Sequence, residues 1–136
     1  MSIQTAKLYF ERADDSASSV VDIVDLFTHD AVLKSPREGI FSGQSELEQF
    51  FELNEDFFDS GRHDMTSFYE VGTTVICEGT ISGETYAGRR YEGVGLVDVM
   101  EFDGHKIAEL RVYLDYSGIL SELPESVPDF RESSRE

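Results

Sequence analysis

The sequence predicts an α+β fold in which three helices precede a curved antiparallel sheet, because the spacing of apolar residues changes once along the chain. Before Asp64, apolar residues recur at helical intervals, and from Asp64 to Tyr116 they follow the alternation of β-strands. Turn-forming residues such as those at 103–105 separate the strand-like segments. Helices and strands therefore form two blocks, whereas a parallel βαβ sheet requires them to alternate.

The first block contains the three expected helices and one short strand. Serines suited to an N-cap precede the second helix, and Ser42 or Ser45 opens the third, which carries a heavy apolar face. Pro36 is expected to end the strand, and the segment 60–64 to end the third helix. The helices are expected at residues 4–13, 16–27 and 46–58, and the strand at 30–36.

The second block contains about four long strands, expected at residues 65–71, 73–83, 91–102 and 106–116. A bent sheet wrapped around helices forms a cone, and its interior is the natural place for a ligand. A last short helix is expected to close the domain, which would span residues 1–123, and residues 124–136 are expected to form an acidic tail.

The charge of the chain is unusual. It has 28 Asp and Glu against 11 Lys and Arg, which gives a net charge of −17 spread along the whole length. Such a surface repels nucleic acids and anionic membranes, so neither is an expected partner. The pattern suits a folded protein adapted to high salt, where self-repulsion is screened, and the alternative is an ordinary acidic mesophilic protein.

The sequence also indicates the cellular location of the protein and whether it needs a cofactor. No run approaches the roughly 20 apolar residues of a membrane helix, and the polar N-terminus is unlike a signal peptide, so a cytoplasmic location is expected. The single cysteine, Cys77, is expected to pack as a small hydrophobe. The histidines His29, His63 and His105 lie in predicted turns or element ends, where they would be solvated, without the spacing of metal ligands. No metal and no cofactor are expected.

Asp98 is the residue that most directly suggests function. It lies in the apolar segment 95–104, and burying a lone carboxylate is costly. Strand alternation places Asp98 on the same face as two apolar neighbours, so we expect an apolar pocket around one carboxyl group, and the alternative is a fold-stabilising acid bonded to an amide or a tyrosine. The expected pocket residues are Ser35, Phe50, Leu96, Met100, Leu110, Val112 and Leu114.

Other polar residues have plainer expected roles. Asp115 precedes the last expected helix and is expected to cap it. Arg89 and Arg90 are expected to be solvated in a hairpin, or to meet a substrate anion at the mouth of the cone. Tyr86 and Tyr91 would line that mouth or pair across strands.

Three segments carry a resemblance to a known superfamily: "LFTHDAVLKSP", "FSGQSELEQFF" and "GRRYEGVGLVDVMEFDGHKIAELRVYLDYSGILSEL". In their order and residues they resemble the NTF2-like superfamily, which includes ketosteroid isomerases, SnoaL-like polyketide cyclases and limonene-epoxide hydrolases. The resemblance covers roughly residues 5–123. It implies a cone-shaped, cystatin-like fold and a homodimer formed through the open face of the sheet, where Glu109, Arg111 and Tyr113 are expected.

The resemblance implies roles for two residues. Asp98 matches the pocket acid that donates to the substrate oxyanion in ketosteroid isomerases, and Tyr9 matches the tyrosine that accompanies it. None of the three active sites known in these relatives is complete in this sequence. The isomerase base falls at Ser35 and the cyclase aspartate at Val112, while the epoxide-hydrolase residues fall near Glu78 and Thr80 and again at Val112.

Two classes of function therefore stay open. The first is an isomerase-, cyclase- or lyase-like enzyme that acts on a small apolar, phenolic or carbonyl-bearing molecule, with Asp98 and Tyr9 as hydrogen-bond donors. The second is a non-catalytic ligand-binding or dimerisation domain that has lost the family base, as Ser35 and Val112 indicate. The identity of the ligand cannot be read from the sequence.

Overall fold

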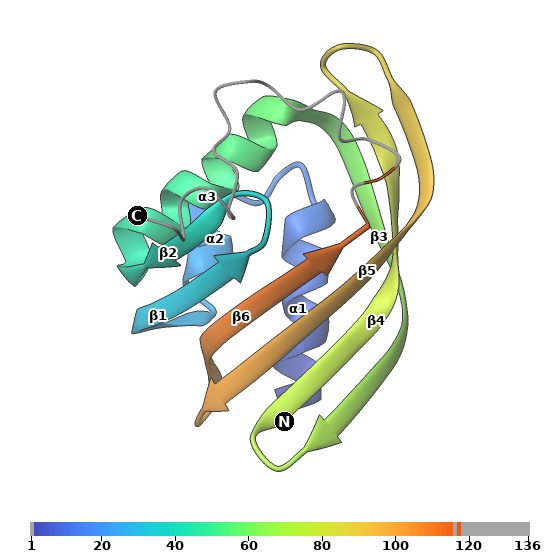
Figure 1. The fold of residues 1–136 in the computed structure, drawn as a ribbon. Coiled ribbons are helices and arrows are strands. Elements are labelled where there is room, and N and C mark those ends of the chain that lie inside the picture. Colours follow the sequence, from blue (N-terminus) through green and yellow to red (C-terminus); the bar gives the residue numbers. More distant parts are fainter. Residues whose placement is uncertain (1, 116, 118–136) are drawn as a thin grey trace.

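The computed structural model describes residues 2–115 and residue 117, and for residues 56–60 it describes the backbone only. A strongly curved sheet wraps around the helices, and α1 lies across its inner side (Figure 1). The expected α+β fold is confirmed. The elements are α1 (Ser2–Asp14), α2 (Val20–Val24), β1 (Phe27–Ser35), β2 (Gly39–Ser42), α3 (Gly43–Phe57), β3 (Phe58–Val71), β4 (Thr74–Thr85), β5 (Arg90–Asp103) and β6 (Lys106–Leu114).

Local sequence signals explain where the helices begin. Ser19 caps α2 through a capping box: its hydroxyl accepts from the backbone N–H of Asp22, and the Asp22 carboxylate accepts from the backbone N–H of Ser19. At α3, the Glu46 carboxylate accepts from the backbone N–H of Ser42 at 2.8 Å. None of the helices in the described part of the chain is long and apolar enough to cross a membrane.

The sheet has six strands in the order β2-β1-β6-β5-β4-β3. All neighbouring strands are antiparallel except β1 and β6, which are parallel and join the N-terminal block to the rest of the sheet. The sequence did not predict β2. It predicted that residues 60–64 end the third helix, and α3 does end before them, at Phe57. These residues do not form a break between helix and strand, because they belong to β3 and pair with β4. The expected last helix at 117–123 and the tail at 124–136 lie outside the described residues, apart from Ser117.

Close backbone contact supports the curvature of the long strands. The pairing of β3 with β4 shifts register between Met65 and Ser67, and Gly79 of β4 faces this irregularity. A Cβ atom on Gly79 would lie 2.3 Å from the carbonyl oxygen of Asp64. Only glycine allows the two strands to approach this closely, because the neighbouring atoms belong to the backbone and cannot move aside.

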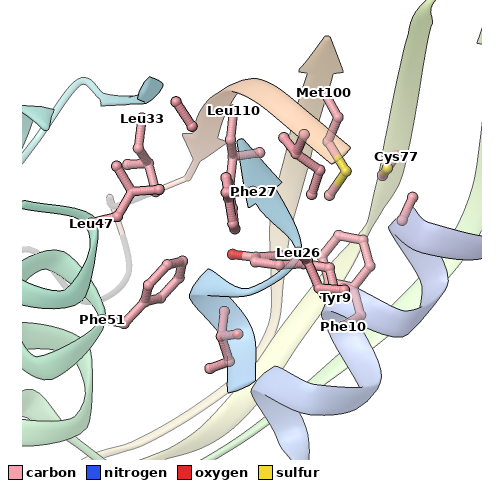
Figure 2. Packing of buried hydrophobic residues seen from close by; sticks show 14 of the residues in the cluster. Tyr9, Phe10, Leu26, Phe27, Leu33, Leu47, Phe51, Cys77, Met100 and Leu110 are labelled. Atoms are coloured by element: carbon pink, nitrogen blue, oxygen red, sulfur yellow. The ribbon is translucent and has the colours of Figure 1, made fainter. Parts of the chain in front are cut away.

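The core lies between the inner face of the sheet and the helices. Fully buried side chains on the inner face include Leu33, Met100, Ile107 and Leu110, and α3 contributes Leu47. Figure 2 shows aromatic rings from α1, β1 and α3 meeting in this core: Tyr9 packs against Phe27 and Phe51 with ring-centroid distances of 6.0 and 6.1 Å. The core therefore fixes α1 and α3 on the concave face, where the cavity described below opens.

Candidate functional site

A cavity of about 410 Å³ opens between the helices and the inner face of β3 to β6. Side chains from all three helices and from four strands line it, so segments far apart in the sequence meet there. Ligand sites of small-molecule proteins commonly have this concave, partly apolar form. The lining residues are Tyr9, Arg12, Ala13, Asp14, Asp15, Ser16, Ser18, Ile23, Glu38, Phe50, Phe51, Asn54, Glu55, Gly61, Arg62, His63, Ile81, Tyr91, Leu96, Asp98, Val112 and Leu114.

Asp98 lines this cavity from the middle of β5. Its strand neighbours in the register are Cys77 on β4 and Val112 on β6, so no polar side chain lies beside it across either strand pair. The side chain is almost fully buried, with 2% of the residue exposed, and its Oδ1 atom has no hydrogen-bond partner among the described residues. Burial raises the pKa of Asp98 from its usual 3.8 to about 7, and the nearby His63 partly opposes this rise.

Tyr9 lines the cavity from α1. Its ring is held by Phe10 at 5.0 Å between ring centroids and by Phe27 and Phe51 at about 6 Å. Burial, and the negative charge of Asp98 next in importance, raise the pKa of Tyr9 well above its usual value. The phenol therefore keeps its proton and can serve as a hydrogen-bond donor.

His63, which sequence reasoning placed in a solvated turn, is another polar residue of the cavity. That interpretation is wrong, because His63 lies on β3, lines the cavity and pairs with Asp14 at the end of α1. Its Nδ1 atom lies 2.5 Å from Oδ1 of Asp14, and its backbone N–H donates to Oδ2 of the same carboxylate at 2.9 Å. The two residues are 49 positions apart, so local sequence patterns gave no signal for the pair.

Tyr91 completes the polar side of the cavity from β5. Burial raises the pKa of Tyr91 to about 12, with a smaller contribution from the charge of Asp14. Gly61 of β3 lies beside it, since a Cβ atom on Gly61 would be 3.3 Å from the Tyr91 hydroxyl. Tyr91 is therefore a buried lining residue of the cavity, whereas Tyr86 is 64% exposed and is not among the lining residues.

The predicted pocket residues divide into two groups. Phe50, Leu96, Val112 and Leu114 line the cavity together with Asp98 and Tyr9. The other three, Ser35, Met100 and Leu110, are fully buried and are not among the lining residues. Met100 and Leu110 pair with each other across β5 and β6, two positions along the strands from Asp98 and Val112, and both belong to the hydrophobic core.

Ser35 influences the cavity indirectly. Its hydroxyl hydrogen-bonds the carboxylate of Glu38, and Glu38 is a lining residue. The turn between β1 and β2 thus brings a carboxylate close to the position where the resemblance expected an acidic base. Because Glu38 lies three residues beyond Ser35, a residue-by-residue match at Ser35 did not reveal it.

The remaining candidates lie away from the cavity. Glu78 is exposed, and Thr80 shares its side of β4, opposite to the buried face. Cys77 is buried as expected. The Asp115 carboxylate accepts from the backbone N–H and the hydroxyl of Ser117, as expected of a cap, although the helix it would cap lies outside the described residues. No group of three potential metal-ligating residues occurs among residues 2–115 and 117.

The outer face of the sheet carries an ion network. The Arg111 guanidinium pairs with Glu109 on its own strand and with Glu101 on β5, and Lys34 on β1 pairs with Glu109 at 3.4 Å. Tyr113 lies on the same strand and is 48% exposed. This face is separated from the cavity by the full thickness of the sheet, because alternate residues of β6 point to opposite sides.

The SnoaL-like domain family matches residues 9–110, from Tyr9 on α1 to Leu110 on β6. The chain belongs to the SnoaL-like domain family. The match includes Asp14, His63 and Asp98, and it agrees with the superfamily that the sequence resembles. Comparison with curated proteins found no match.

Solved structures similar to this fold have NTF2-like or ketosteroid isomerase-like architecture. One is a hypothetical protein from Catenulispora acidiphila in complex with trimethylamine, with a TM-score of 0.80 and 15% identity over 91% of this chain and 96% of that chain. Another is a putative SnoaL-like polyketide cyclase from Jannaschia, with a TM-score of 0.77 and 14% identity over 89% and 90%. TerC, co-crystallised with polyporic acid, has a TM-score of 0.77 and 16% identity over 88% and 95%. At these identities the likeness shows the fold alone.

Proposed function

We propose that the protein is an acid–base enzyme that transfers a proton on a small, largely apolar, carbonyl-bearing molecule held in the cavity. The observation that carries this proposal is that His63, bonded to Asp14, and the buried Asp98 line the same cavity. A base and an acid with separate environments in one apolar pocket are the minimum set for proton transfer next to a carbonyl group.

His63 is the proposed base. Its Nδ1 atom is bonded to Asp14, so the other ring nitrogen, Nε2, is the one that accepts a proton from the substrate. The Asp14 carboxylate then stabilises the imidazolium that forms and holds the ring in one orientation. This pair supplies the base that the sequence lacks at Ser35 and Val112.

Asp98 is the proposed acid. With a pKa raised to about 7, a large share of the Asp98 carboxyl groups is protonated near neutral pH and can donate to the carbonyl oxygen of the substrate. The hydroxyl of Tyr9 is a second proposed donor, because its raised pKa keeps it protonated. Donors already fixed in a dry site stabilise the oxyanion that forms when a proton leaves the adjacent carbon.

The apolar wall favours a compact hydrophobic substrate. Phe50 and Phe51 of α3 and Leu96 of β5 line the cavity, and its volume suits a molecule of a few fused rings rather than a polymer. Isomerisation, cyclisation and elimination of such compounds all begin by moving a proton beside a carbonyl group. TerC, co-crystallised with polyporic acid, and the putative SnoaL-like polyketide cyclase from Jannaschia share the fold and offer an analogy for a small-molecule site.

Hydrogen–deuterium exchange of 2-tetralone in D₂O, followed by NMR, tests the proposal because any positioned base accelerates loss of its α-protons. We expect the wild type to accelerate exchange above buffer and His63→Gln to reduce the enzymatic rate by about 100-fold. His29→Gln, which changes an exposed histidine of β1, is the matched control and should exchange at the wild-type rate. Equal rates for wild type and His63→Gln would contradict the proposed base.

The second candidate is the non-catalytic ligand-binding domain that the missing family base suggested. In that case 2-tetralone would bind with no acceleration of exchange in any variant. Binding followed by chemical-shift changes, measured in the same samples, separates a binding protein from a protein without affinity for the probe.

A further inference from the structure

The cavity has more acidic groups than its proposed reaction uses. Five carboxylate side chains line it, against two guanidinium groups. One guanidinium, that of Arg12, donates from Nη1 to the backbone carbonyl of Asp22 at 2.6 Å, which holds it toward α2. The cavity is therefore an environment of negative potential. Burial is the largest cause of the raised pKa of Tyr9, and the charges of Asp98 and Asp14 add to it.

Asp98 differs from the other acids of the cavity. Asp14 is paired with His63, and Glu38 accepts a hydrogen bond from Ser35. Asp98 is 2% exposed and its Oδ1 atom has no partner among the described residues, although it lines a cavity wide enough to admit a ligand. Burying an ionised carboxylate costs free energy unless a positive group pairs with it. A cationic ligand would form this ion pair with Asp98.

Aromatic rings surround the same space. Tyr9 and Phe51 are in contact with each other, Phe50 packs on Phe51 at 5.2 Å between ring centroids, and Tyr91 of β5 also lines the cavity. The faces of aromatic rings attract alkylammonium ions, whose charge is spread over apolar CH groups. A buried carboxylate in a cavity that is also lined by aromatic rings is thus complementary to an organic cation rather than to a hydrated metal ion.

We propose that the cavity binds a small alkylammonium ion, with the Asp98 carboxylate as its counterion and the rings of Tyr9, Phe50, Phe51 and Tyr91 around its alkyl groups. This binding mode goes beyond the proposed function, because it requires no proton transfer. It uses the ionised form of Asp98, whereas the carbonyl-bearing substrate uses the protonated form. The titratable groups that face Asp98 are Tyr9 from α1, His63 from β3 and Cys77 from β4.

The test compares two probes of nearly equal shape. N,N-dimethylbenzylammonium carries an N–H⁺ group, and the neutral 2-methyl-1-phenyl-2-propanol carries a C–OH group in the same place. Dissociation constants are measured by NMR titration at pH 8 and constant ionic strength. For the wild type we expect the ammonium ion to bind at least tenfold more tightly than the alcohol. If the dissociation constant of the alcohol were less than threefold that of the ammonium ion, the wild type alone would overturn the inference.

Asp98→Asn then assigns the preference to one side chain. It keeps the size of Asp98, and we expect it to reduce the ratio to about one while the alcohol binds within threefold of the wild type. Glu92→Gln removes an exposed carboxylate from the same strand, outside the cavity lining, and should keep the wild-type ratio. An unchanged ratio in Asp98→Asn would refute the counterion role.

The outcomes are distinguishable from those of the proposed function. Preferential ammonium binding without exchange of 2-tetralone supports the cation site and contradicts the acid–base enzyme. Exchange of 2-tetralone without preferential ammonium binding supports the acid–base enzyme and contradicts the cation site.

Discussion

The Nδ1 atom of His63 lies 2.5 Å from Oδ1 of Asp14, which joins the middle of β3 to the last residue of α1. The second oxygen of the same carboxylate accepts from the backbone N–H of His63. One side chain therefore fixes both the ring and the backbone of the proposed base. Both residues are about one-quarter exposed, so the pair faces the cavity and is accessible to a ligand.

Substitutions of Asp14 separate its two roles. Asp14→Asn keeps an oxygen that can accept from the backbone N–H of His63, so we expect a fold close to the wild type but at least tenfold slower exchange of 2-tetralone. Asp14→Ala leaves that N–H without its acceptor and should lower the free energy of unfolding by about 1–3 kcal/mol in urea titrations. If Asp14→Asn exchanged at the wild-type rate, the carboxylate would have no part in the reaction.

The buried Asp98 makes stability depend on pH. Unfolded, this carboxyl ionises near its usual pKa of 3.8, whereas in the folded protein its pKa is about 7, so the folded state keeps a proton that the unfolded state loses. The contribution of Asp98 to the free energy of unfolding is therefore full below about pH 4, falls as pH rises to about 7, and is lost above that. The loss is on the order of 4 kcal/mol.

Urea titrations of the wild type and Asp98→Asn between pH 4 and 8 measure this contribution. The difference in stability between the two proteins should shift in favour of Asp98→Asn as pH rises through this range. Taking the difference removes the pH dependence that arises from groups distant from Asp98, which both proteins share. A difference independent of pH would show that Asp98 is ionised in the folded state throughout.

Three glycines give graded packing tests. Alanine at Gly61 would place its Cβ atom 3.3 Å from the Tyr91 hydroxyl, so that ring must shift slightly, and we expect several-fold weaker binding of 2-tetralone with little loss of stability. Alanine at Gly79 would meet backbone at 2.3 Å and should destabilise the fold by roughly 3 kcal/mol or more. Gly95 has open space around its Cβ position, so Gly95→Ala is the control with wild-type binding.

The charge of −17 predicts a salt dependence of stability. We expect the melting temperature to rise between low salt and molar KCl, because screening weakens repulsion among the acidic side chains. Most of the rise should occur below about 0.5 M, where the screening length changes most. A flat or falling curve would contradict the proposed adaptation to high salt.

The outer face of the sheet is the proposed homodimer interface. The ion network around Arg111 and the half-exposed Tyr113 form a mixed polar surface there, on the side opposite to the cavity. Light scattering in molar salt should give the mass of a dimer for the wild type and of a monomer for Tyr113→Glu. A monomeric wild type would contradict the dimer, and a dimeric Tyr113→Glu would exclude an interface centred on Tyr113.

Strand alternation was sufficient to predict the inner face of β5, because apolar residues at every second position all point to the same face of the sheet, which must then be the buried face. It placed Asp98 among Leu96 and Met100, and all three are buried. Alternation shows which side chains share a face of the strand, but it does not show which of them border a cavity. It therefore did not distinguish Leu96, which lines the cavity, from Met100, which does not.

The first half of β3 was not predictable by the same reasoning. Gly61, Arg62 and His63 have weak β-strand preference, and their strand conformation comes from pairing with β4, a long-range interaction. His63 was therefore assigned to a turn, and its partner Asp14 to the end of a helix. Only the three-dimensional arrangement brings these two ordinary surface residue types together as a candidate site.

The contact of Asp14 with the backbone of His63 also bears on aggregation. β3 is a terminal strand of the sheet, so its side away from β4 presents N–H groups to which another chain can add a strand. The Asp14 carboxylate occupies one such N–H and brings negative charge to that strand edge. The residue that orients the proposed base thus also protects the sheet, so natural or engineered loss of Asp14 would favour intermolecular β-pairing together with loss of activity.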